Sequence, residues 1–151
     1  MRALVVCVGN DLAADDGVGR EVFLELGKRA LQDDVRLVFL GLGGIDLIEQ
    51  LDGEERLIVV DAVQFGEPPG TVHILDWDSL PHMAPRPVSG HGIGVREAIE
   101  VCARLYPERV PKNIWLVGIE GECFDQLGAG LSADVQQAVT EAADVVSSLL
   151  K

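Results

Sequence analysis

Three acidic positions and one histidine in this chain lie where an α/β protein places its ligand-binding groups. Asp15 and Asp16 follow an apolar run of strand length, and Asp61 follows another. His91 lies between two glycines, directly before a segment with helical periodicity. Residues at the carboxyl ends of parallel strands and at the helix starts after them converge on one crevice of a wound sheet. We therefore expect these side chains to lie close together.

Two carboxylates and an imidazole form a chemically plausible set of ligands for a divalent metal ion. Carboxylate oxygen and imidazole nitrogen suit zinc or nickel, and three protein ligands leave coordination positions open for water or a substrate atom. The glycines beside His91 let the backbone approach closely. A helix N-terminus also disfavours the imidazolium, which keeps a ring nitrogen free to bind metal. The pattern predicts an open metal site, because closed structural sites usually have four ligands.

Each of these residues also has a structural interpretation. Asp16 could complement the dipole of the helix that follows it, and Asp61 could cap a turn. His91 could be a solvated loop residue, and we interpret His73 and His82 as structural. The residues alone leave the metal site and the structural interpretation both open.

Other well-known motifs do not fit the sequence. A dinucleotide fingerprint requires Gly-x-Gly-x-x-Gly, whereas Gly9 has no glycine two or five residues on, and phosphate would face two aspartates. An EF-hand calcium loop needs a different acidic spacing. The chain has no Gly-x-Ser-x-Gly elbow, and Cys7, Cys102 and Cys123 have no evident base. We interpret the three cysteines as reduced core thiols of a cytoplasmic protein.

The composition indicates one aliphatic and acidic domain that covers residues 1–151. The chain has 48% hydrophobic residues but only 5% aromatic ones, which is typical of a buried parallel sheet. Its formal net charge of -13 disfavours nucleic acid and anionic membranes as partners. The N-terminal apolar run is too short for a membrane span and unlike a secretory signal, so we expect a cytoplasmic location. We also expect a monomer, because the sequence shows no heptad repeat and no long exposed apolar stripe.

Apolar runs of strand length alternate with helical patterns along most of the chain. Strands are predicted at residues 3–8, 35–40, 56–60, 71–75 and 113–119. Helices are predicted at residues 18–31, 45–51, 93–105 and 132–150. The link between the third and fourth strands is too short for a helical crossover, which predicts a hairpin-like return and a mixed sheet. Residues 76–92 contain three prolines and predict an extended surface loop.

Five motifs occur in a fixed order over nearly the whole chain. They are VGN-x-L-x-x-DDG-x-G at residues 8–19, LIVVDA at 57–62, SGH-x-x-GV at 89–95, LVGIEGE at 116–122 and GLS at 130–132. This ordered combination is far more specific than any single motif. It resembles the family of NiFe-hydrogenase maturation proteases, which are endopeptidases of the hydrogenase large-subunit precursor.

The resemblance implies a three-layer α/β/α fold around a twisted, mainly parallel but mixed five-stranded sheet. It also implies three metal ligands, which by motif are Asp16, Asp61 and His91. Family members are thought to recognise nickel already inserted into the precursor and then to remove a short C-terminal extension. This chain departs from the family in two places: some members have Glu where Asp16 stands, and the pattern Gly-Ile-Glu-Pro-Glu has Gly instead of Pro at residues 118–122.

The function that the resemblance implies is that of an aspartyl-type endopeptidase. Asp16, Asp61 and His91 would recognise nickel supplied by the precursor, with zinc or another divalent ion as a possible surrogate, and Asp16 or Asp61 would assist peptide hydrolysis. The same ligand set would serve a non-catalytic nickel-binding maturation module that checks or hands over metal without cleavage. A metallohydrolase acting on small peptides is a third alternative.

Overall fold

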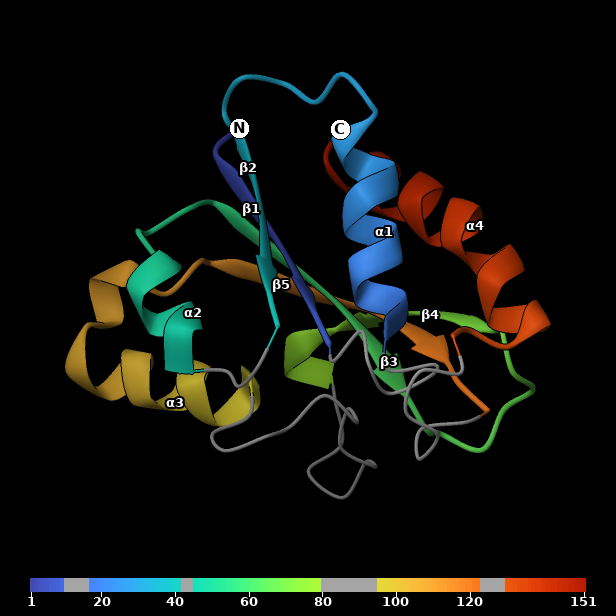
Figure 1. Cartoon of the computed structure of the whole chain (residues 1–151). Helices are drawn as coiled ribbons and strands as arrows, with labels where there is room; N and C mark the ends of the chain where they lie inside the picture. The colour runs from blue at the N-terminus through green and yellow to red at the C-terminus, as the bar shows by residue number, and fades with distance from the viewer. Residues whose placement is uncertain (10–16, 42–44, 80–94, 123–129) are drawn as a thin grey trace.

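In a computed structural model of the protein, a five-stranded sheet forms the centre (Figure 1). The structure describes residues 1–9, 17–41, 45–79, 95–122 and 130–151. The strands are β1 (Ala3–Val8), β2 (Val35–Leu40), β3 (Arg56–Val63), β4 (Val72–Asp76) and β5 (Asn113–Glu120). They lie in the order β2-β1-β3-β5-β4. The pairs β1–β2, β1–β3 and β3–β5 are parallel, and β4 pairs antiparallel with β5. The predicted mixed and mainly parallel sheet is confirmed. The predicted hairpin-like return between the third and fourth strands is wrong, because β5 lies between β3 and β4 and is the strand with which β4 pairs.

Among the described residues, four α-helices cover the two faces of this sheet. They are α1 (Val18–Gly27), α2 (Ile45–Gln50), α3 (Val95–Leu105) and α4 (Ala133–Leu149). Figure 1 shows α1 and α4 together on one face, and α2 and α3 together on the other. Two short 3-10 helices, η2 (Trp77–Ser79) and η3 (Pro107–Arg109), complete the described elements. The arrangement is the predicted three-layer α/β/α fold. No described helix combines the length and the apolarity that crossing a bilayer requires.

The buried side chains of the strands alternate between two cores. In β3, Ile58 and Val60 pack towards α1 and α4, whereas Leu57 and Val59 pack towards α2 and α3. All six residues of β1 are buried. Strands covered on both faces need apolar residues at every position, because successive side chains point to opposite faces. This requirement explains why the sequence of the central strands is continuously apolar.

The strand β3 is longer than predicted. Its register with β5 runs from Arg56 opposite Asn113 to Val63 opposite Glu120. The sequence prediction ended this strand at Val60, before the acidic residue Asp61. The long β5 strand supplies partners for three more residues, and this pairing outweighs the local preference of an aspartate for turns. Asp61 therefore lies within a strand and not at its end.

The helix α1 is shorter than predicted, and its start is fixed by a close contact with β1. The helix ends at Gly27 instead of residue 31, since the Lys28 N–H donates to the Glu25 carbonyl in a tight turn. At the other end, a Cβ on Gly19 would stand 2.1 Å from the carbonyl oxygen of Val8. Only glycine permits this approach of a helix to a strand end. The sequence predicts an extended surface loop at residues 76–92. Its described part is instead the end of β4 at Asp76 and the 3-10 helix at Trp77–Ser79, and residues 80–92 lie outside the described residues.

Candidate functional site

Of the three predicted metal ligands, only Asp61 is among the described residues. Asp16 and His91 fall in residues 10–16 and 80–94, which are outside the described part of the chain. The Asp61 side chain is completely buried. Its Oδ1 accepts a hydrogen bond of 2.8 Å from the backbone N–H of Ala62. Burying a carboxylate is costly, and such groups are kept where they are paired or bind a cation. The interpretation of Asp61 as a simple turn cap is wrong, because it lies in the middle of a paired strand.

The strand register aligns Asp61 with the carboxyl end of β1. Asp61 lies opposite Gly118 of β5, and Gly118 lies opposite His73 of β4. Cys7 of β1 lies opposite Val60 of β3. The next residue of each strand continues this register, so Val8, the last residue of β1, is level with Asp61. This row of residues marks the edge of the sheet at which an α/β protein usually binds its ligands.

The segments that carry the other two predicted ligands are attached to residues of one buried core cluster. Residues 10–16 follow β1 and precede α1, and residues 80–94 precede α3. Val8 and Val95, at the ends of β1 and at the start of α3, belong to the same core cluster. That cluster lies on the sheet face to which Asp61 points by strand alternation. These attachments agree with the predicted convergence, whereas the places of Asp16 and His91 themselves stay predictions.

The packing beside Asp61 has no room for a side chain at residue 118. A Cβ on Gly118 would lie 2.9 Å from Cγ1 of Val63. Val63 is two residues from Asp61 in the same strand and points to the same face. A larger residue opposite Asp61 would therefore displace the end of β3.

A second buried carboxylate, Glu120, ends the strand β5 and is only 2% exposed. Its two oxygens accept hydrogen bonds of 3.1 and 2.9 Å from the backbone N–H of Phe65, and Oε1 lies 3.0 Å from Nε2 of His73. The Phe65 ring meets the imidazole edge-on, with 5.0 Å between the ring centroids. Glu120 thus ties both the chain after β3 and the edge strand β4 to the central sheet.

Sequence reasoning missed the pairing of Glu120, and the structural interpretation of His73 agrees with its contact with this residue. The signal for Glu120 was an acidic residue directly after the apolar run at residues 116–119. Its partner could not be identified locally, because His73 lies 47 positions earlier and is brought there by antiparallel pairing.

The two described cysteines, Cys7 and Cys102, are free and buried, as predicted. Burial raises the pKa of the Cys7 thiol far above its usual range, and the negative charge of Asp61 adds to this effect. Burial also raises the pKa of Cys102. A cysteine attacks a substrate as the thiolate, so neither residue is suited to be a nucleophile at neutral pH. Cys123 lies outside the described residues.

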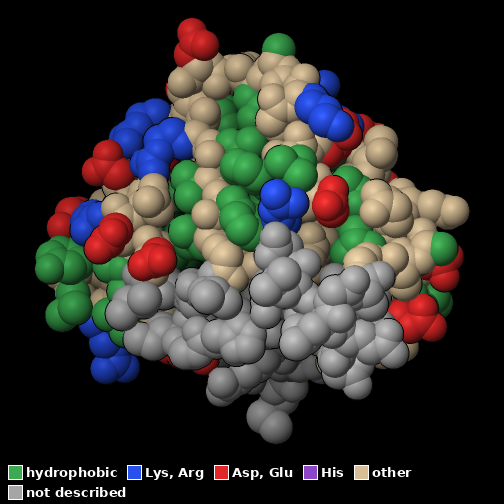
Figure 2. All heavy atoms as spheres, in the orientation of Figure 1, with side chains coloured by type: hydrophobic (Ala, Val, Ile, Leu, Met, Phe, Trp, Pro, Cys, Tyr) green, Lys and Arg blue, Asp and Glu red, His purple; other side chains and the backbone are tan. Residues whose placement is uncertain are grey.

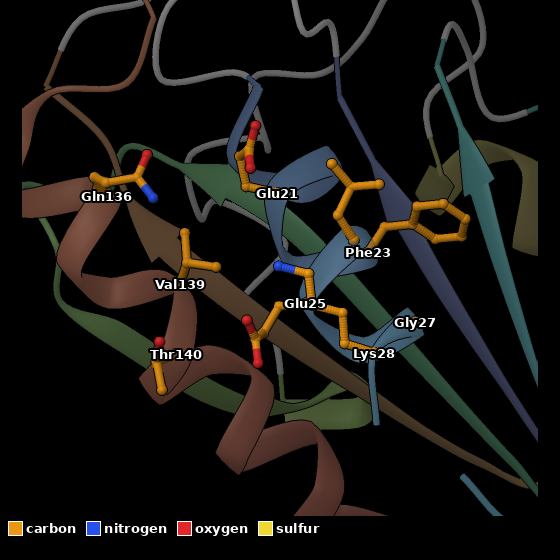
Figure 3. Close-up of a pocket in the computed structure, with 9 residues that line it drawn as sticks. Glu21, Phe23, Glu25, Gly27, Lys28, Gln136, Val139 and Thr140 are labelled. Carbon is orange, nitrogen blue, oxygen red and sulfur yellow. The ribbon is translucent and has the colours of Figure 1, made fainter. Parts of the chain in front are cut away.

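A groove of about 560 Å³ lies on the opposite face of the sheet from Asp61 (Figure 3). Glu21 and Glu25 of α1 line one side, followed by Lys28, and Val139 and Thr140 of α4 line the other. This groove is separated from Asp61 by the sheet and is not part of the candidate site. Within the described part of the chain, no three His, Cys, Asp or Glu residues form a metal-binding group.

Residues 21–149 match the hydrogenase maturation protease family, HycI. The hydrogenase 2 maturation protease of Escherichia coli is 29% identical, and the match covers 100% of this chain and 92% of that protein. A putative hydrogenase maturation protease of Methanocaldococcus jannaschii is 30% identical, with 98% of this chain and 96% of the relative covered. The hydrogenase expression/formation protein HupD of Thiocapsa roseopersicina is also 30% identical over 97% of this chain, which spans 66% of that longer relative.

Solved structures of such proteases share the fold. The hydrogenase maturating endopeptidase HybD from E. coli superposes with a TM-score of 0.86 at 28% identity, covering 99% of this chain and 92% of that one. HybD from Thermococcus kodakarensis, a NiFe-hydrogenase maturation protease, gives a TM-score of 0.83 at 25% identity and is matched over the full length of both chains. This chain, a peptidase, therefore belongs to the hydrogenase maturation protease family.

Proposed function

We propose that this peptidase removes a C-terminal extension from the large-subunit precursor of a NiFe-hydrogenase after nickel has been inserted. The observation that carries the proposal is the placement of Asp61. It is a completely buried carboxylate in β3, level with the end of β1 and beside the core that holds the start of α3. Membership of the family supports the endopeptidase activity, and the motifs at residues 8–19 and 89–95 support the choice of its partner residues.

Nickel belongs to the substrate in this proposal. Asp16, Asp61 and His91 are the residues that would contact it, through carboxylate oxygen and imidazole nitrogen. Three such ligands without a thiolate leave the coordination sphere incomplete, so they gain affinity only for a metal ion that the precursor already holds. The protein then distinguishes the two forms of the precursor because its affinity for the nickel-loaded form is higher than its affinity for the nickel-free form. Zinc or another divalent ion can serve as a surrogate in binding experiments.

Hydrolysis requires a group that accepts a proton from the attacking water and returns one to the leaving amine. We propose that Asp61 or Asp16 performs this acid–base step at the peptide bond beside the metal. Water adds to the carbonyl carbon, the C–N bond breaks, and the extension leaves with a free amino terminus. Cys7 and Cys102 do not take part, because their raised pKa values keep both thiols protonated.

The test compares nickel-loaded with nickel-free precursor, incubated with the wild-type protein and with the variants Asp16→Asn, Asp61→Asn and His91→Ala. Mass spectrometry of the precursor then reports loss of the extension. We expect cleavage only of the loaded precursor by the wild-type protein, and at least 100-fold slower cleavage by each variant. Glu141→Gln, an exposed position of α4, is the matched control and should cleave at the wild-type rate. Metal-dependent binding without any change in precursor mass would instead support the non-catalytic maturation module.

A further inference from the structure

The strand β2 forms one edge of the sheet, and no other described strand pairs with its outer side. In Figure 1 this strand lies at the front of the molecule, beside α1. Figure 2 shows hydrophobic side chains gathered over this part of the surface, above the grey segments. The outer edge of β2, defined as the side facing away from β1 along residues 35–40, is the surface considered below.

The hydrogen bonds of the sheet determine which backbone groups of β2 point outward. The Ala3 N–H donates to the Asp34 carbonyl at 3.1 Å, and the Gly9 N–H donates to the Leu40 carbonyl at 3.4 Å. In a parallel ladder the bonding groups alternate, so the even-numbered residues of β2 bond to β1. The N–H and C=O groups of Leu37 and Phe39 therefore point away from the sheet. At Val35 only the C=O is available, because its N–H donates to the Gln32 carbonyl.

This outer edge carries only one of the devices that usually prevent an edge strand from pairing, an exposed charged side chain. Such edges generally carry prolines or exposed charged side chains. β2 contains no proline, and its one charged residue is Arg36. The Arg36 guanidinium donates to the carbonyl and side-chain oxygens of Gln50 and to Oε2 of Glu54, which holds it against the end of α2. The Phe39 side chain packs towards α1, with its ring centroid 5.7 Å from that of Phe23. The outward backbone groups of Leu37 and Phe39, two residues with apolar side chains, are suited to binding another strand.

The outer edge also leads to the candidate site. Leu40, the last residue of β2, lies opposite Val8, which is level with Asp61. With strands about 4.8 Å apart, a strand added outside β2 would run about 14 Å from β3. An extended chain crosses that distance with about four residues. The outer edge is therefore about four extended residues away from β3, the strand that carries Asp61.

We propose that the outer edge of β2 binds an extended, apolar segment of the precursor by strand addition. This inference rests on the proposed function, because it assigns a binding surface to the same substrate. A peptidase must hold its substrate extended near the cut bond, and backbone hydrogen bonds to Val35, Leu37 and Phe39 hold a chain in that conformation. Alternate side chains of the segment would lie against the apolar surface formed by α1 and β2. The occupant in this proposal is a segment of the precursor adjoining its cleavage site, because the outer edge ends level with Asp61.

Hydrogen exchange of the wild-type protein tests the proposal without a mutation. Mass spectrometry follows the peptides that contain residues 35–40 and 72–76, with and without nickel-loaded precursor. We expect at least tenfold slower exchange of the Leu37 and Phe39 amides in the complex. Residues 72–76 form the opposite edge strand β4 and should exchange at unchanged rates.

A pair of proline variants tests the same surface by kinetics. Leu37→Pro removes an outward N–H and places a ring where the added strand would lie. Ile74→Pro, in the opposite edge strand β4, is the matched control. Thr71 bonds to β5 through the Glu120 N–H, and in an antiparallel ladder the residues of one strand alternately bond to the neighbouring strand and point away from it. The N–H of Ile74, three residues after Thr71, therefore points outward from β4. We expect Leu37→Pro to raise KM for the loaded precursor about tenfold with kcat unchanged. Ile74→Pro should leave both within twofold, and circular dichroism checks that both variants are folded.

The outcomes separate this proposal from the proposed function. If the wild-type protein does not cleave the precursor, the proposed function fails, whereas slower exchange at residues 35–40 would still support strand addition. If it cleaves but residues 35–40 show no protection, or Leu37→Pro matches Ile74→Pro in KM, strand addition is overturned. Protection that appears without precursor and grows with protein concentration would also overturn it, since a second copy would then occupy the edge. If Leu37→Pro does not fold, the exchange measurement decides.

Discussion

Replacing the buried carboxylate of Asp61 should affect the activity of the protein but not reduce its stability. Asparagine has the same shape and keeps an oxygen that can accept the hydrogen bond from the Ala62 N–H. It removes a buried negative charge, so Asp61→Asn should leave the free energy of unfolding unchanged or raise it by about 1 kcal/mol. Cleavage of the precursor should fall at least 100-fold. Urea unfolding together with the cleavage assay checks both parts, and an active variant would rule out a role for the carboxylate.

The Cys7 thiol should make the stability of the protein depend on pH. Its pKa is raised in the folded state, whereas an exposed thiol ionises near pH 9. As the pH rises through 9, the unfolded chain loses this proton and the folded chain keeps it, so rising pH favours unfolding. The slope approaches about 1.4 kcal/mol per pH unit above pH 9. Urea unfolding at pH 8, 9 and 10 should show a shallower decline for Cys7→Ala than for the wild-type protein. Equal slopes for the two proteins would contradict the raised pKa of the Cys7 thiol as a cause of the decline. The Cys7→Ala variant should still cleave the precursor.

The strands β4 and β5 are joined at their ends by the Glu120–His73 pair. Glu120→Ala would leave the imidazole of His73 and the N–H of Phe65 without their buried partner. We expect this variant to lose about 2–4 kcal/mol of the free energy of unfolding. A double-mutant cycle with His73→Gln should give a coupling energy of at least about 1 kcal/mol. A loss below about 0.5 kcal/mol in Glu120→Ala would show that the pair does not hold the two strands together.

The pairing of β3 with β5 beside Asp61 depends on the absence of a side chain at residue 118. Gly118→Ala places a Cβ 2.9 Å from Val63 and should cost about 1–3 kcal/mol while slowing cleavage. Gly27→Ala is the matched control, since a Cβ there meets nothing within 4 Å and alanine favours a helix. We expect Gly27→Ala to leave cleavage unchanged and to be neutral or slightly stabilising. Equal cleavage by the two variants would contradict the importance of the packing at Gly118.

Local sequence patterns predicted most elements but not how they pair. The five strands and four helices follow from apolar periodicity, which is a property of neighbouring residues. The three extra residues of β3 depend on β5, and the contact between Glu120 and His73 depends on β4, so both arise from contacts between distant segments. Of the candidate site, the sequence predicted that Asp61 lies near the carboxyl end of β1, whereas its role in metal binding and hydrolysis stays a prediction. It did not show that Asp61 lies inside a strand, because a local pattern does not reveal the partner that extends that strand.

The central sheet separates two faces of the molecule that carry different features. The sheet divides the candidate site, on the side of α2 and α3, from the groove between α1 and α4. The outer edge of β2 connects with the candidate side at the row of Asp61. A fold shared with HybD of E. coli at a TM-score of 0.86 and 28% identity shows that this three-layer frame tolerates wide sequence change. The layers therefore act as a frame that holds Asp61 level with the carboxyl end of β1.

The dependence of cleavage on nickel in the precursor tests the central claim most directly. One preparation of precursor is divided, nickel is inserted into one half, and both halves are incubated with the wild-type protein and analysed by mass spectrometry. The proposed recognition by Asp16, Asp61 and His91 predicts that only the nickel-loaded half loses its extension, and that Asp61→Asn cleaves neither. Cleavage of both halves at the same rate by the wild-type protein would contradict the claim.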